Sequence, residues 1–203
     1  MASDEVTPSV LLARTGRMPL PADFNGGSGS LERGGVRVPL IVIPPKGQKF
    51  VRADQKTDAF AHVKDLPITI LDYAGVEHPQ TAYEGRKIVA PSGVSMRKFL
   101  EGSSPSPRTE EQWVAFELFG NSYVVAGDYK AIRVRTAMYG DGKWHLYDIK
   151  KDPGETRPLD AEYPDQLEKM ITIYEKYAKD KGIVPVSDNW SPWHGFIDEN
   201  KQN

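Results

Sequence analysis

The clearest pattern of apolar positions lies near the end of the chain, between Pro164 and Lys181. Apolar residues recur there at intervals of three and four, as on one face of a helix. They are Leu167, Met170, Ile171, Tyr174, Tyr177 and Ala178. Pro164 suits the first helical position, because no amide hydrogen is needed there, and Gly182 is a usual C-terminal stop. The pattern predicts an amphipathic helix that covers a neighbouring sheet.

Short apolar segments separated by turn residues precede this helix. The strand candidates are 114–119, 122–125, 129–135 and 144–148. The expected turns are Gly120-Asn121, Gly127-Asp128 and Gly140-Asp141-Gly142. Closely spaced strands with such turns are typical of an antiparallel meander. We therefore expect a small four-stranded antiparallel sheet packed on the helix.

A different pattern lies upstream. The β-branched run at 36–43 predicts a short strand buried on both faces, as in a parallel sheet covered by helices, although Pro39 interrupts it. Residues 65–73 fit a helix with Asp65 as its N-cap, Pro67 in its first turn and a stop at Ala74-Gly75. A strand followed by a helix indicates half of an α/β unit.

The remaining segments are rich in turns. Met96–Leu100 fits one short helical turn, and 102–107 reads as an exposed connection. Residues 1–30 are poorly patterned and contain a Gly/Ser run at 26–30, which is typical of a flexible linker, natural or engineered. The tail from 184 carries Trp190, Trp193 and Phe196, which we expect to dock on the body or on something missing.

Composition narrows the function classes. A length of 203 residues predicts one domain, with room for a small appendage. The 26 Lys and Arg against 28 Asp and Glu give a net charge of −2, so nothing favours binding to nucleic acid or to an anionic membrane. We see no secretory leader and no spanning segment, and expect a soluble protein, with the cytoplasm favoured. The cysteine count of 0 excludes a disulfide framework, a thiolate zinc site and a cysteine nucleophile.

The residues alone indicate no active site. The four histidines are His62, His78, His145 and His194. None has metal-ligand spacing, so each is read as structural or exposed. No Walker loop and no Gly-x-Ser-x-Gly elbow occurs, and Asp152–Glu155 reads as a turn.

Several segments together nevertheless resemble one family. Gly34-Gly35-Val36-Arg37-Val38-Pro39 resembles the Gly-Gly-(Ile/Val)-Arg-Val-Pro segment of sulfatases, and 62–75 is similar to the helix that follows it there. The later segments resemble the final small domain of that family; they are 116–121, 127–130, 144–149 and 151–155. Their order over about residues 31–184 is most similar to type I sulfatases, the arylsulfatases of bacteria and fungi.

This resemblance implies an alkaline-phosphatase-like fold and sulfate ester hydrolysis. In the intact family a formylglycine, made from the Cys or Ser of Cys/Ser-x-Pro-x-Arg, attacks sulfur, and calcium held by Asp and Asn polarises the sulfate. Aryl sulfate esters are the substrates there. The C-terminal subdomain of the family has a four-stranded antiparallel sheet and one helix, in agreement with the pattern above.

The present sequence departs from the family at the positions of its catalytic and calcium-binding residues. Ser104-Pro105-Ser106-Pro107-Arg108 has Ser106 where proline is required, and Asp23-Phe24-Asn25-Gly26 interrupts the Asp-Asn-Gly pattern. Ser28 stands where the family has a sulfate-binding lysine. We therefore assign no catalytic, cofactor-binding or metal-ligating residue, and we expect neither calcium nor formylglycine in this chain.

Two interpretations follow. The preferred one is a C-terminal arylsulfatase fragment, inactive alone, so enzyme status is left open. It divides into a poorly patterned 1–30, a remnant of the large α/β domain at 31–110, the C-terminal subdomain at 111–184 and an aromatic tail at 185–203. The alternative is a non-catalytic module that docks on itself or on a full-length sulfatase through apolar surface left by the missing domain.

Overall fold

The computed structural model describes residues 9–12, 38–44, 50–51, 55–138 and 140–190. It divides into two compact units. The first spans Val38–Gln112 and includes the strand at 9–12, and the second begins, among the described residues, at Trp113. No helix in these ranges is long and apolar enough to cross a bilayer.

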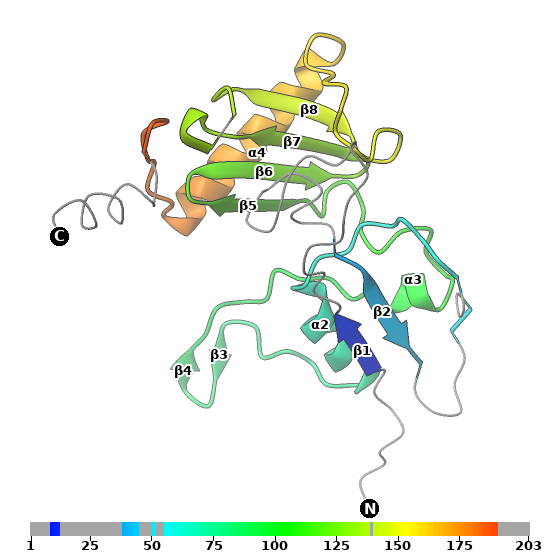
Figure 1. The fold of residues 1–203 in the computed structure, drawn as a ribbon. Helices are drawn as coiled ribbons and strands as arrows, with labels where there is room; N and C mark the ends of the chain where they lie inside the picture. The colour runs from blue at the N-terminus through cyan, green and yellow to red at the C-terminus, as the bar shows by residue number, and fades with distance from the viewer. Residues whose placement is uncertain (1–8, 13–37, 45–49, 52–54, 139, 191–203) are drawn as a thin grey trace, which may run out of the picture. The chain divides into compact units, whose positions relative to one another are not determined.

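The second unit contains the predicted meander. One antiparallel sheet has the strand order β5-β6-β7-β8, so each strand pairs with its neighbour in sequence (Figure 1). The strands are β5 Val114–Leu118, β6 Asn121–Ala126, β7 Tyr129–Arg133 and β8 Trp144–Asp148. The four-stranded sheet expected from the sequence is thus confirmed.

Helix α4, Pro164–Lys181, crosses one face of this sheet (Figure 1). Its bounds match the predicted helix, and Gly182 ends it in the left-handed conformation at φ 65°. Met170 is fully buried against a row of side chains that lie opposite one another across all the strands. The row is Ala115, Val124, Ala131 and Leu146. Alternation along each strand places this small-and-large apolar row on the helix side.

The first hairpin turn lies one residue earlier than predicted. Phe119 and Gly120 form it, with φ of 53° and 79°, and Asn121 is already the first residue of β6. A two-residue loop with both φ positive matches the twist of a hairpin, which accounts for glycine at the second position. A Cβ at Gly120 would also overlap the side chains of Val186 and Arg135.

The first unit is organised around helix α2, Asp65–Tyr73, and the short α3, Arg97–Leu100. Both helices were expected at these positions. Their buried side chains form one core cluster, which consists of Phe50, Leu66, Tyr73, Met96, Phe99 and Leu100. The predicted cap was wrong, because Lys64 is the N-cap residue and Asp65 lies inside the first turn. The carboxylate of Asp65 is used elsewhere, as described below.

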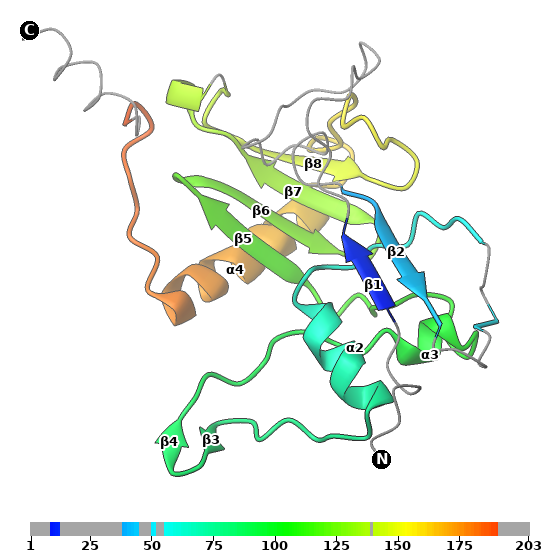
Figure 2. The ribbon, with the colours of Figure 1, turned by 60° about the horizontal axis from the view of Figure 1, so that its bottom comes forward.

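The strand expected at 36–43 differs from the prediction in partner and burial. β2, Leu40–Ile43, pairs antiparallel with β1, Ser9–Leu12, from a segment without a clear pattern (Figure 2). Leu40 and Val42 pack against the core cluster, whereas Ile41 and Ile43 are 47% and 51% exposed. The core cluster covers only one face of β2, so the expectation of a strand buried on both faces was wrong.

Two further details of the first unit were not foreseen. A small hairpin joins β3, Ala82–Tyr83, to β4, Arg86–Lys87, through Glu84 and Gly85, both at positive φ. The connection at 102–107 is not exposed throughout, because Pro107 is buried beside the buried Arg108.

The aromatic tail is described as far as Trp190. Its carbonyl accepts a hydrogen bond from Arg135 Nη1 at 2.7 Å, and its ring lies 5.4 Å from the Arg135 guanidinium carbon. Arg135 lies between β7 and the 3-10 helix η1, Thr136–Met138, so Trp190 contacts the chain at this connection. Trp193 and Phe196 lie outside the described residues.

Candidate functional site

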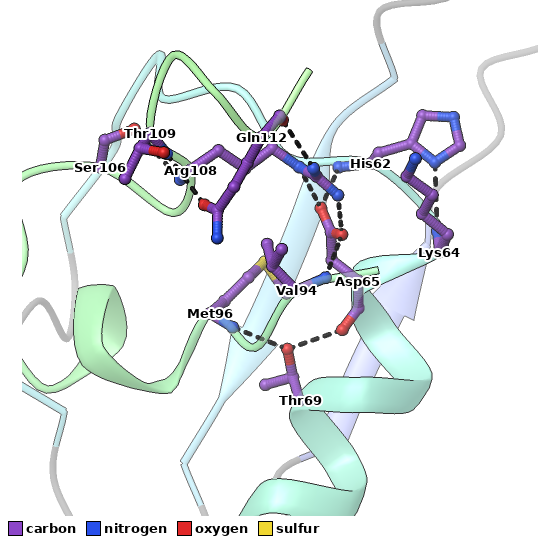
Figure 3. Close-up of polar contacts among 10 residues, drawn as sticks. All are labelled: His62, Lys64, Asp65, Thr69, Val94, Met96, Ser106, Arg108, Thr109 and Gln112. Carbon is purple, nitrogen blue, oxygen red and sulfur yellow. Dashed lines mark hydrogen bonds and ion pairs between the residues drawn. The ribbon is translucent and has the colours of Figure 1, made fainter. Parts of the chain in front are cut away.

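The most strongly buried charges of the first unit are Asp65 and Arg108, whose side chains are 0% and 5% exposed. The guanidinium faces the carboxylate with two N–H groups (Figure 3). Arg108 Nε donates to Asp65 Oδ2 at 3.0 Å, and Nη2 donates to Oδ1. A third nitrogen, Nη1, donates to the carbonyl of Gln112 at 2.9 Å. This fork geometry is the strong form of a charge-assisted hydrogen bond.

Backbone donors complete the surroundings of the Asp65 carboxylate. The amide of His62 donates to Oδ2 at 2.8 Å, and that of Val94 donates to Oδ1 at 2.9 Å (Figure 3). One turn further, Thr69 Oγ1 donates to the Asp65 carbonyl and accepts from the Met96 amide. The start of α2 thus ties together the segments around 62, 94 and 108.

Gly93 shows how closely these segments approach. A Cβ at this position would overlap the carbonyl of Lys64, the N-cap residue of α2. Backbone cannot yield as a flexible side-chain end can, so the 93–96 segment reaches α2 only with glycine at this point.

The site is saturated with protein partners. Each carboxylate oxygen of Asp65 accepts two hydrogen bonds, which occupies the lone pairs that a metal or a substrate proton would need. Nearby His62 accepts from the Lys64 amide through Nδ1, and burial, then the charge of Lys64, lowers its pKa. With Nδ1 bonded to a backbone amide two residues on, the imidazole of His62 supports the local structure at the start of α2.

The second unit has its own buried ion pair. Lys130 Nζ lies 2.8 and 2.9 Å from the two carboxylate oxygens of Glu155, and both side chains are at most 5% exposed. Lys130 comes from β7 and Glu155 from the turn predicted at 152–155. The ammonium also lies 5.5 Å from the centre of the Tyr123 ring, and burial raises the pKa of that tyrosine to about 12. This pair was not predicted, because neither residue stands out locally in the sequence.

A small cavity of about 190 Å³ lies beside this pair, lined by residues of β7, β8 and their connection, with Glu155. The lining residues are Ile132, Val134, Gly140, Asp141, His145, Tyr147 and Glu155. Of the three histidines that the structure describes, only His145 reaches it. His78 accepts from the Gln80 amide in an exposed turn, and His194 lies outside the described residues.

The family's calcium and formylglycine do not fit the residues that can be placed. Within the described ranges, no group of three or more His, Asp or Glu side chains is arranged to hold a metal ion. In the Ser104–Arg108 segment, Arg108 is committed to Asp65, and Ser104 and Ser106 hydrogen-bond each other. Asp23, Asn25 and Ser28 lie outside the described residues.

Comparison with known proteins finds sulfatases among the relatives of this chain. No protein-family model matches it. An uncharacterised sulfatase of Schizosaccharomyces pombe is 32% identical over 163 residues, which cover 80% of this chain and 28% of that protein. An N-acetylglucosamine-6-O-sulfatase of Bacteroides thetaiotaomicron is 27% identical over 152 residues, or 70% of this chain and 25% of that protein. The chain thus spans about a quarter of the length of these curated relatives.

Solved structures agree on the fold. A sulfatase from a study of glycosaminoglycan metabolism by Bacteroides thetaiotaomicron has a TM-score of 0.61 at 21% identity, covering 77% of this chain and 32% of that one. Ps i-CgsB in complex with a neocarrahexaose has a TM-score of 0.57 at 21% identity, covering 83% and 33%. At 21% identity these neighbours show the fold of the chain alone, which is alkaline-phosphatase-like.

The chain is therefore a relative of the sulfatases, as its sequence motifs indicated. More particularly, it corresponds to the C-terminal part of such a protein.

Proposed function

We propose that this chain is the C-terminal part of an arylsulfatase-like protein, and that it serves sulfate ester hydrolysis only together with a catalytic part. One observation carries the proposal: the sequence match to the Schizosaccharomyces pombe sulfatase covers 80% of this chain but only 28% of that protein. The 203 residues contain no cysteine and no Ser-x-Pro-x-Arg, so they cannot supply the precursor of a formylglycine. The role of this part is to form a folded subdomain next to the catalytic part.

The purified chain is the first test. Incubated with a fluorogenic aryl sulfate and calcium, it should release no product above the buffer rate. Turnover that is lost on chelation and returns with calcium would refute the proposal, because it would require a complete site within these 203 residues.

Complementation is the second test. The Schizosaccharomyces pombe relative, truncated before the region matched here, should be co-expressed with this chain and, as a matched control, with its own C-terminal region. We expect a stable complex in both cases, and aryl sulfate hydrolysis wherever the control shows it. The proposed role would be contradicted if the truncated relative were active with its own C-terminal region but neither bound this chain nor became active with it.

The exposed face of β2 supports the alternative of a non-catalytic docking module. Ile41 and Ile43 are about half exposed on a short strand, and Val38 is 44% exposed just before it. Exposed apolar side chains on one strand face are typical of a surface that associates. On this alternative, light scattering should show a concentration-dependent dimer that the double substitution Ile41→Lys and Ile43→Lys abolishes. A monomer at all concentrations would count against it.

A further inference from the structure

His145 occupies an unusual position between two carboxylates of the second unit. Its Nδ1 lies 2.7 Å from Asp160 Oδ2, and its Nε2 lies 3.0 Å from Asp141 Oδ2. The ring is partly exposed, at 29% of its side-chain surface. Each ring nitrogen therefore faces its own carboxylate oxygen, and the two carboxylates lie on different sides of the ring.

Both contacts can be hydrogen bonds only if the ring is charged. A neutral imidazole has one N–H donor and one lone pair, and a lone pair facing a carboxylate oxygen is repulsive. An imidazolium donates from both nitrogens. Partial burial alone would lower the pKa of His145, but the hydrogen bonds and charges of Asp160 and Asp141 outweigh it, so the pKa is raised.

Asp160 links this ring to the edge of the sheet. β8 is the last strand in the order β5-β6-β7-β8, so one side of its backbone has no strand partner among the described residues. Asp160 Oδ1 accepts from the Leu146 amide at 2.6 Å, and the Leu159 amide donates to the Leu146 carbonyl at 2.8 Å. The 159–160 segment thus covers an edge that would otherwise present open hydrogen-bonding groups.

We propose that His145 is a pH-sensitive clamp: protonated, it binds Asp141 and Asp160 together and holds the β8 edge closed, and deprotonated, it lets that edge open. The clamp joins the connection before β8 to the connection after it. The cavity described above shares Asp141 and His145 with the clamp. The proposal does not depend on sulfatase activity.

Among the described residues, the other charged group that acts on Asp141 is Lys143, whose amide hydrogen bond and charge also lower the pKa of that carboxyl. Lys143 donates its amide to Asp141 Oδ1 at 2.9 Å, which fixes that side chain without replacing the imidazole. On the cavity side, Glu155 is engaged by Lys130. The titratable and charged groups around the ring are Asp141, Lys143, Tyr147, Glu155 with Lys130, and Asp160.

The direction of the effect follows from linkage. Since folding raises the pKa of His145 above its ordinary 6.5, the contribution of the clamp is complete below that value. It is lost as the pH rises through the higher value of the folded chain. Each unit by which folding raises the pKa of His145 corresponds to about a tenfold change in the equilibrium for opening of the β8 edge.

The decisive experiment follows two signals of the full chain by NMR between pH 5 and 9. One is the titration of the His145 ring, and the other is hydrogen exchange of the Leu146 amide, corrected for its intrinsic pH dependence. We expect His145 to titrate above 6.5 and Leu146 protection to fall with the same midpoint. The proposal would be overturned if His145 titrated at or below pH 6.5. It would also be overturned if the protection of the Leu146 amide did not change at the titration midpoint of His145.

Variants separate the clamp from general stability. His145→Gln should show weak Leu146 protection already at pH 5.5 and no pH-dependent step. Asp141→Asn removes one carboxylate and should lower the midpoint while the Asp160 contact persists. His78→Gln, a histidine of the first unit, is the matched control and should leave Leu146 unchanged. Protection in His145→Gln equal to that of the parent at low pH would refute the clamp.

Discussion

Two ion pairs, Asp65–Arg108 and Lys130–Glu155, are almost entirely shielded from water, one in each unit. Burying a charge is costly unless it is paired and hydrogen-bonded, and both pairs meet that condition. Their partners lie 43 and 25 residues apart in sequence. Each pair therefore fixes contacts between distant segments, and losing one partner leaves an uncompensated buried charge.

Arg108→Met should lower the free energy of unfolding of the first unit by about 3–5 kcal/mol, the usual effect of breaking a buried pair. The Asp65 carboxylate would keep only its two backbone donors. Denaturant unfolding checks this, with Arg86→Met as the control, because Arg86 is exposed on β4. A loss in Arg108→Met no larger than in Arg86→Met would show that the pair contributes little.

Gly93→Ala tests the close approach of the 93–96 segment to α2. Its Cβ would overlap the Lys64 carbonyl, and we expect a loss of about 2–4 kcal/mol in unfolding free energy, as for overpacking. Gly75→Ala is the comparison: nothing lies within 4 Å of its Cβ, and only its φ of 67° opposes alanine, at about 1–2 kcal/mol. Thermal melts of both variants distinguish a clash from backbone strain. Equal melting temperatures would rule the clash out.

At the scale of elements, the sheet and α4 depend on one another. The helix contributes Met170, with no exposed surface, and the sheet contributes a row of apolar residues that would otherwise face water. In a folded protein most of the stability of a helix comes from packing of its apolar face, with helix propensity contributing less. The edge strands need separate protection, which the 159–160 segment gives to β8.

Met170→Ala should therefore destabilise the second unit by about 2–5 kcal/mol, from lost burial and the cavity left behind. Thr172→Ala, exposed on the same helix, should change the unfolding free energy by less than about 0.5 kcal/mol. Urea unfolding followed by tryptophan fluorescence reports on this core, because Trp113 and Trp144 both pack against it. Similar midpoints for the two variants would contradict the assigned packing.

At the scale of the whole molecule, the chain has the fold of a sulfatase part without placed residues that suit the family's calcium. If it is a part that lacks this site, calcium should not stabilise it. A site with a dissociation constant of about 10 µM would add about 2.7 kcal/mol at 1 mM calcium. We expect the melting temperature to be the same in 1 mM calcium and in chelator. A clear rise with calcium, absent with magnesium, would reveal a site and contradict this expectation.

The elements with strong local signals could be predicted from the amino-acid sequence. α4 and α2 have the predicted bounds, because periodic apolar positions, Pro164 and the glycines at 75 and 182 act within a few residues. The meander was predictable for the same reason, and so was the family, since its motifs are ordered along the chain. The absence of any cysteine limits the chemistry without reference to a fold.

The contacts between separate segments became apparent in the folded chain and could not be predicted from local sequence. The antiparallel pairing of β2 with β1, the pairs Asp65–Arg108 and Lys130–Glu155, and the position of His145 between Asp141 and Asp160 all join segments across loops. Local patterns hold no information on which charge meets which. Burial and hydrogen bonding select the partner, because an unpaired polar group inside the protein costs more than most local preferences supply.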